Sequence, residues 1–214
     1  MDPADEIIPL VASSCTGETL RFHVHRGVLC KSSVFFQNAV KPEWTMQREG
    51  VVNLPKDSAK TVVDYIKWLY SDRMSIELYT SGGGTIEENA AEAEKVFVQL
   101  AEAYVFGEMI VDIKYKNAVM ETVVAARAAS GWNMGPESVT IAYEGTPPAS
   151  PLRRFIAESI AHKAHLNSKD SIGWAQYIEE YPRDVLVDAM KAMVKVRPAV
   201  SESCPLVDSY LENL

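Results

Sequence analysis

The spacing of hydrophobic residues changes near residue 26, and this change predicts a strand followed by a pair of helices. Leu20, Phe22 and Val24 alternate with polar residues, which is the two-residue period of a strand that buries one face. After a possible turn at Gly27, apolar residues recur at the spacing of packed helices: Val28, Leu29, Val34, Phe35, Phe36, Ala39 and Val40. A hydroxyl at residues 32–33 can cap the second helix, so we expect a short, tightly connected helix pair.

Two further apolar runs predict strands. Residues 7–11 fit a first strand, which forms a hairpin with residues 20–24 through a turn at Gly17. Val51, Val52 and Leu54 predict a short strand that Pro55 closes. We therefore expect a small sheet that is built from short strands.

Helical spacing covers most of the remaining chain. Helices are expected over residues 58–71, 87–107, 117–130, 152–166 and 182–197, with Gly107 ending or bending the second of them. Residues 81–84 predict a flexible loop, and residues 138–143 predict a short extended piece. The Pro-rich residues 144–150 exclude a helix before Pro151, which suits a first helical turn with Ser150 as its cap.

Composition and charge narrow the class of protein. Of 214 residues, 47% are hydrophobic and 23% are charged, which is typical of a soluble globular chain. The net charge of -8 argues against direct nucleic-acid binding. No apolar run approaches the roughly 20 residues that a membrane span needs. The three cysteines are far apart in the sequence, which favours a reducing compartment, the cytoplasm or the nucleus.

Few residues carry the pattern of a catalytic or metal site. His23, His25 and Cys30 are close in sequence, but no second ligand pair accompanies them, so we expect no metal. Cys30 follows an apolar pair, where a thiol is more often a core residue than a nucleophile. Residues 82–84 lack the Lys and Ser or Thr of a phosphate loop. We expect neither enzyme activity nor a cofactor.

Several of these segments together resemble a known family. Residues 20–40 combine an aromatic strand residue, a His followed by a basic residue, Val-Leu, a Ser and an aromatic pair. Trp-Leu-Tyr at residues 68–70, Tyr-Val-Phe-Gly at 104–107 and Asn-Ala-Val-Met at 117–120 follow in order. Over residues 7–122 the chain resembles a BTB/POZ domain, and these later segments, with the Ser-Pro-Leu-Arg-Arg run at 150–154, resemble its fungal branch.

The resemblance implies an α+β fold, in which a small sheet is covered by a helical cluster and followed by an all-helical extension. We expect the BTB/POZ domain at residues 1–125, a linker with a Pro-rich loop at 126–150, and the helical extension at 151–214.

The function implied by the resemblance is non-enzymatic protein binding, with homodimerisation through the first strand and first helices. The expected dimer interface consists of Ile7, Ile8, Leu10, Val28, Leu29 and Phe35. One alternative is a substrate adaptor of a cullin-type ubiquitin ligase, whose partner-binding loop would consist of Phe36, Trp44, Met46 and Glu49. In such adaptors a hydrophobic residue lies two before a Glu, whereas Gln47 occupies that position here. A second alternative is a transcriptional regulator that acts through partners.

Two Ser/Thr-Pro steps suggest regulation. Thr146 and Ser150 precede prolines in what we expect to be an exposed loop, where a phosphate would be favoured by the following helix start and by Arg153 and Arg154. The competing interpretation is a helix cap, with the two arginines pairing Glu144 or Glu158.

Overall fold

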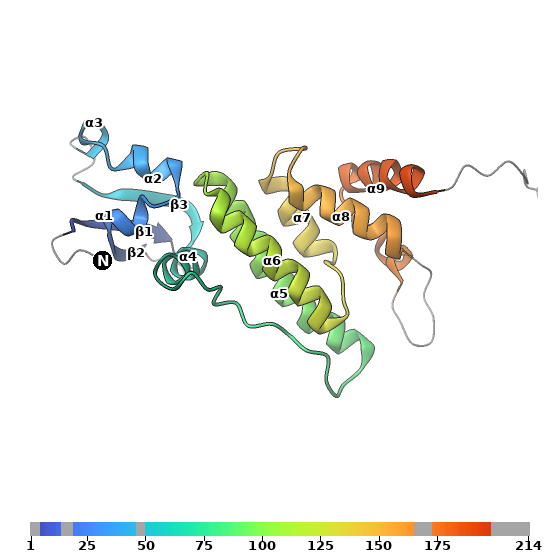
Figure 1. Cartoon of the computed structure of the whole chain (residues 1–214). Coiled ribbons are helices and arrows are strands. Elements are labelled where there is room, and N and C mark those ends of the chain that lie inside the picture. Colours follow the sequence, from blue (N-terminus) through green and yellow to red (C-terminus); the bar gives the residue numbers. More distant parts are fainter. Residues whose placement is uncertain (1–4, 14–18, 46–49, 165–172, 198–214) are drawn as a thin grey trace, which may run out of the picture.

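A three-stranded mixed sheet forms one end of the molecule (Figure 1). The computed structural model describes residues 5–13, 19–45, 50–164 and 173–197. The strands are β1 Ile7–Ser13, β2 Thr19–His25 and β3 Val52–Ser58, in the order β2-β1-β3. β1 is antiparallel to β2, with Ile8 opposite Val24, and parallel to β3, with Leu10 opposite Val52. The expected hairpin is confirmed, and β1 is the central strand.

The sheet departs from the sequence expectation in two places. Of the alternating residues in β2, Val24 is buried, Phe22 is half-buried and Leu20 is 40% exposed, so the burial of this face decreases toward the start of the strand. Pro55 does not end β3, which continues to Ser58 after a shift in its register with β1. Since Pro donates no ladder hydrogen bond, it is tolerated at such an irregularity.

Four helices lie around the sheet: α1 Arg26–Leu29, α2 Val34–Ala39, α3 Pro42–Thr45 and α4 Ala59–Ser71. The Ser33 hydroxyl accepts a hydrogen bond from the Phe36 N–H at 3.1 Å and caps α2, as expected. Pro42 begins the short helix α3, so Trp44 lies in a helix and the expectation of a loop there is wrong. The C-cap of α4 is Asp72, which has a left-handed φ of 52°.

Two long helices form the centre of the molecule (Figure 1). α5 spans Ile86–Met109 and begins with a capping box between Thr85 and Glu88, and α6 spans Ile113–Ser130. Gly107 neither ends nor interrupts α5. It is buried, and a Cβ there would come within 2.8 Å of the Lys116 side chain, so glycine allows α5 and α6 to approach closely.

The remaining helices are α7 Pro136–Gly145, α8 Pro151–Lys163, the 3-10 helix η2 Trp174–Tyr177 and α9 Arg183–Val196. The extended piece expected at residues 138–143 is wrong, because these residues lie within α7, which packs on α5. The expected linker at 126–150 contains the end of α6 and all of α7. The chain is therefore α+β, with a helical C-terminal region.

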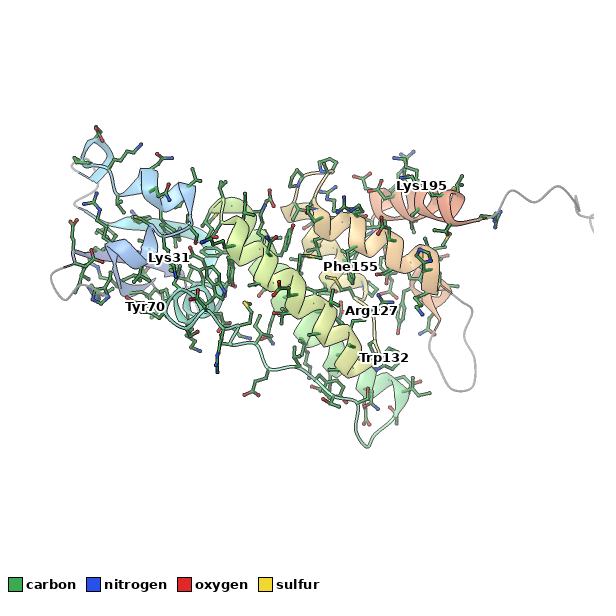
Figure 2. All side chains as sticks on the ribbon, in the orientation of Figure 1. Lys31, Tyr70, Arg127, Trp132, Phe155 and Lys195 are labelled. Atoms are coloured by element: carbon green, nitrogen blue, oxygen red, sulfur yellow. The ribbon has the colours of Figure 1, made fainter. Side chains whose placement is uncertain are left out.

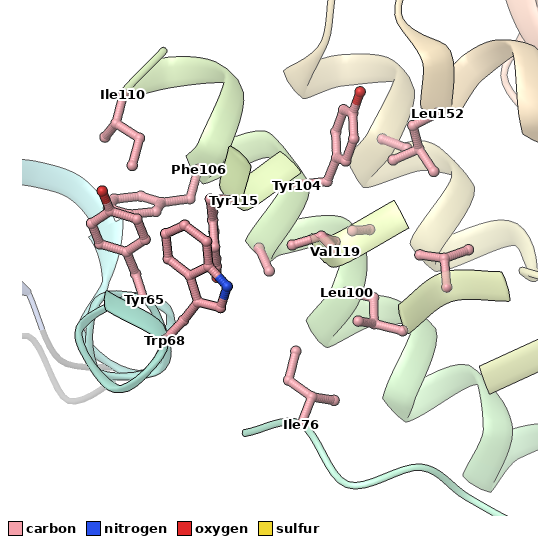
Figure 3. Packing of buried hydrophobic residues seen from close by; sticks show 14 of the residues in the cluster. Tyr65, Trp68, Ile76, Leu100, Tyr104, Phe106, Ile110, Tyr115, Val119 and Leu152 are labelled. Carbon is pink, nitrogen blue, oxygen red and sulfur yellow. The ribbon is translucent and has the colours of Figure 1, made fainter. Parts of the chain in front are cut away.

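α5 buries residues on two sides, and this joins the N-terminal and C-terminal parts into one core. On one side the rings of Tyr65, Trp68, Phe106 and Tyr115 cluster between α4 and the α5–α6 pair (Figure 3). The ring centroids of Tyr65 and Tyr115 lie 4.8 Å apart at a steep angle, which is a favourable edge-to-face arrangement. On the other side the Tyr104 ring lies beside Leu152 of α8, and Leu100 belongs to the same core (Figure 3).

Candidate functional site

A buried carboxylate at the turn between α5 and α6 connects three segments that are distant in sequence. Asp112 is fully buried, and its Oδ2 accepts hydrogen bonds from Ser32 Oγ at 2.6 Å and Tyr65 Oη at 2.9 Å. Its Oδ1 caps α6 by accepting from the Tyr115 N–H at 3.0 Å. Burial, followed by the charge of Asp112, raises the pKa of Tyr65, so this hydroxyl remains protonated and donates to the carboxylate.

The start of α2 is bound directly to this turn. Ser33 Oγ donates to the Ile110 carbonyl at 2.7 Å, and the N–H groups of Val34 and Phe35 donate to the carbonyls of Val111 and Ile110 at 3.4 and 3.3 Å. The first N–H groups of a helix have no partner within the helix, so the turn supplies acceptors that α2 itself lacks. These bonds fix α2 to the end of α5.

Exposed apolar side chains gather at this junction. We call Val34, Met109, Val111 and Ile113 the junction patch, and their exposed fractions lie between 40% and 65%. Hydrophobic periodicity does not reveal most of this patch, because Met109, Val111 and Ile113 lie at helix ends, where periodicity is weak. Val111 also has a left-handed φ of 52°, which is unfavourable for a β-branched residue. A rigid turn that exposes apolar residues is typical of a binding surface.

Only some of the expected dimer residues are available to a partner. Ile7 is exposed, and Val28 and Phe35 are half-buried. The remaining three are buried in the core of the same chain: Ile8, Leu10 and Leu29. β1 also has a neighbouring strand on each side, so it offers no free edge to a second copy. The expected dimer interface stays a prediction, and within it a partner could contact Ile7, Val28 and Phe35.

Two of the four residues of the expected partner-binding loop lie within the described part of the chain. Phe36 is fully buried, and its ring stacks on Tyr65 with centroids 6.0 Å apart, so it belongs to the core. Trp44 lies in α3, while Met46 and Glu49 lie outside the described residues.

The expectation that Thr146 and Ser150 lie in an exposed loop is wrong, because both are buried. Ser150 Oγ caps α8 by accepting from the Leu152 N–H at 3.3 Å, which confirms the cap interpretation. Arg153 is buried as well and donates to the carbonyls of Tyr143 and Thr146. Its guanidinium lies 4.6 Å from the Tyr143 ring centroid. Arg153 therefore closes the end of α7 rather than pairing Glu144 or Glu158.

His25 and Cys30, two of the residues considered for metal binding or nucleophilic chemistry, are in contact with neighbouring parts of the fold. His25 Nδ1 lies 2.7 Å from Tyr70 Oη, and Cys30 is half-buried. Burial raises the pKa of the Cys30 thiol, which opposes formation of a reactive thiolate. Within the described ranges, no group of three or more His, Cys, Asp or Glu residues could hold a metal ion. No helix in those ranges is long and apolar enough to cross a membrane.

A cavity of about 300 Å³ lies where α5, α6, α8 and η2 meet. Several aromatic side chains line its walls, and Figure 2 shows Arg127, Trp132 and Phe155 near one another, with the Arg127 guanidinium 5.9 Å from the Phe155 ring centroid. Glu94 is the most buried acidic group in the wall, and its carboxylate accepts from the N–H groups of Gly135 and Ser138 at 2.7 and 2.8 Å. This carboxylate caps α7 and is already engaged.

The N-terminal part of the chain, with its sheet and surrounding helices, matches a known family. The model of the BTB/POZ domain family matches residues 13–104, which run from the end of β1 into α5. A BTB/POZ domain is a protein–protein interaction module and is not normally catalytic. The match does not bear on the fungal branch, which stays a prediction. No curated protein matches the chain.

Proposed function

We propose that the BTB/POZ domain of this chain is a non-enzymatic interaction module that forms a homodimer through the junction patch. The observation that carries the proposal is the exposure of Val34, Met109, Val111 and Ile113 at one junction of α2 with the α5–α6 turn. Burying such side chains between two copies would remove apolar surface from water, and this would stabilise the dimer by roughly 25 cal/mol for each Å² of apolar surface buried.

Two features of the junction favour association. The bonds to Asp112 and to the Ile110 carbonyl hold the backbone in place, so little conformational entropy would be lost on binding. Glu108, beside Met109, is paired with Lys116 at 2.7 Å. Because the chain is acidic overall, the pairing of the Glu108 carboxylate with Lys116 reduces repulsion between copies at this patch.

The test is the molar mass in solution, measured by size-exclusion chromatography with light scattering at tens of micromolar. We expect the native chain to be a dimer and Ile113→Asp to be a monomer with an unchanged circular dichroism spectrum. Val124→Asp is the matched control, because Val124 is also exposed on α6 but lies three turns away. A native chain that is already monomeric would contradict the proposal.

The cullin-adaptor and transcriptional hypotheses remain predictions. Met46 and Glu49, two residues of the expected partner-binding loop of the adaptor hypothesis, lie outside the described residues. Among the described residues, no observation favours either hypothesis. Pull-down with the N-terminal region of a cullin would decide the adaptor hypothesis, and absence of binding would exclude it. Nuclear localisation would support only a regulator that acts through partners.

A further inference from the structure

The outer face of α9 carries an apolar row that the described residues leave open. Val187, Met190 and Val194 are 41%, 68% and 72% exposed, and their spacing of three and four residues places them on one face. The opposite face is buried and consists of Val185, Ala189 and Ala192, with α8 as the neighbouring helix (Figure 1). α9 is therefore apolar on two sides, which is the pattern of a helix that a second element covers.

Cationic side chains surround this outer row. Arg183 and Arg197 continue it at both ends with the same spacing, and Lys191 and Lys195 lie beside it, four residues apart. Lys195 projects from α9 away from α8 (Figure 2). Of these cations only Lys191 forms an ion pair with a described residue, at 3.5 Å from Asp188. The face therefore suits an apolar helix that is flanked by carboxylates.

The segment that follows α9 has this chemistry. Residues 206–214 lie outside the described part of the chain, and their sequence carries apolar residues at helical spacing: Leu206, Val207, Tyr210, Leu211 and Leu214. Asp208 and Glu212 lie beside this row, four residues apart, as the two lysines do on α9. Residues 198–214 contain three acidic residues and no Lys or Arg. Pro205 suits the first turn of a helix.

The connection between the two elements is long enough for a reversal of the chain. Eight residues, 198–205, separate α9 and its cap from the apolar segment. Fully extended at about 3.3 Å per residue, they reach roughly 26 Å. The 14 residues of α9 are about 21 Å long at 1.5 Å per residue. The segment can therefore run back along α9 in the antiparallel direction.

We propose that residues 206–214 form an amphipathic helix that packs on Val187, Met190 and Val194 of the same chain. In the antiparallel arrangement Asp208 lies near Lys195 and Glu212 lies near Lys191. This contact completes the C-terminal helical region and is independent of the proposed dimerisation at the junction patch.

The test measures whether the Met190 methyl group is accessible to solvent. The full chain is labelled with 13C at its methionine methyl groups, the Met190 signal is assigned with Met190→Leu, and a soluble gadolinium chelate is added. We expect weak relaxation enhancement at Met190 in the native chain and an increase of several-fold in Val207→Asp/Leu211→Asp. The matched control is Ser209→Asp/Asn213→Asp, which adds the same charge away from the apolar row and should leave Met190 shielded.

Three results would overturn the proposal. The first is strong enhancement at Met190 in the native chain, which means that the segment does not cover it. The second is shielding that the Val207→Asp/Leu211→Asp variant does not reduce, which assigns the cover to another partner. The third is shielding that disappears on dilution, because a second copy would then supply the segment.

Discussion

The Tyr65 hydroxyl donates a hydrogen bond to the buried Asp112 carboxylate at 2.9 Å, and this bond joins α4 to the α5–α6 turn. The Tyr115 ring lies beside it, at 4.8 Å between centroids, yet the buried Tyr115 hydroxyl has no hydrogen-bond partner among the described residues. Two neighbouring tyrosines thus have similar packing and opposite hydrogen bonding. This difference allows the effect of the bond to be separated from that of the ring.

Replacing these tyrosines by phenylalanine should have different effects on stability. Tyr65→Phe removes one donor from Asp112, and we expect the free energy of unfolding to fall by about 1.5–3 kcal/mol, as for other bonds to charged groups. Tyr115→Phe removes a buried hydroxyl without a partner, so its effect should be neutral or stabilising. Urea denaturation followed by tryptophan fluorescence measures both. Equal losses in the two variants would contradict the role of Asp112.

Arg153 and Arg154 are adjacent in sequence and should differ in their contribution to stability. Arg153 is buried, donates to two carbonyls and to Thr146 Oγ1, and lies over the Tyr143 ring, whereas Arg154 is exposed. Arg153→Ala leaves these acceptors unpaired at the end of α7, and we expect a loss of about 3 kcal/mol. Arg154→Ala, the matched control, should change stability by less than about 0.5 kcal/mol. Thermal denaturation of the two variants that gave similar midpoints would refute this assignment.

The parts of the fold that sequence predicted correctly depend on local signals. The alternation around Val24 and the turn before it predict the β1–β2 hairpin. A hydroxyl directly before a helix predicts the caps at Ser33 and Ser150, since cap and N–H groups are neighbours in the chain. Pro151 at the first turn of α8 is a signal of the same kind.

The parts that sequence reasoning missed depend on distant partners. Residues 138–143 contain β-branched residues that favour an extended strand, but Glu94, 41 residues before Gly135, provides the acceptor at the start of α7. Asp112 likewise takes its donor from Ser32, 80 residues earlier. The sequence around a polar residue between two helices does not indicate which distant side chain will form a hydrogen bond with it. The site at the junction was therefore not predictable from periodicity.

The burial of Thr146 and Ser150 predicts that the folded chain resists phosphorylation at both positions. A proline-directed kinase needs an extended, accessible segment, and these hydroxyls are engaged with the Ala142 carbonyl and the Leu152 N–H. We expect a synthetic peptide of residues 141–155 to be modified more than tenfold faster than the intact chain, since about 1.4 kcal/mol of local opening gives that factor. Mass spectrometry with time measures both rates. Similar rates would show that the loop opens readily and would revive the regulatory hypothesis.

Glu94 should make the stability of the fold depend on pH. Burial raises the pKa of its carboxyl above the ordinary 4.5, although the N–H groups of Ser138 and Gly135 oppose this shift. The folded chain therefore binds this proton more tightly than the unfolded chain does. It follows that the contribution of Glu94 to stability decreases as the pH rises from 4.5 through the raised pKa.

The measurement is the free energy of unfolding of the native chain minus that of Glu94→Gln, determined by urea denaturation between pH 4.5 and 7. We expect this difference to decrease with rising pH, because the Gln side chain does not titrate. Glu158→Gln, on the exposed face of α8, controls for the loss of one carboxylate. Even at pH 7, Glu94→Gln should be less stable than the native chain by about 1–3 kcal/mol, since its amide NH2 group would face one of the two N–H donors, that of Gly135 or that of Ser138, and only the other donor would keep an acceptor. A difference that increases with pH would mean that the hydrogen bonds to α7, and not burial, dominate the ionisation of Glu94.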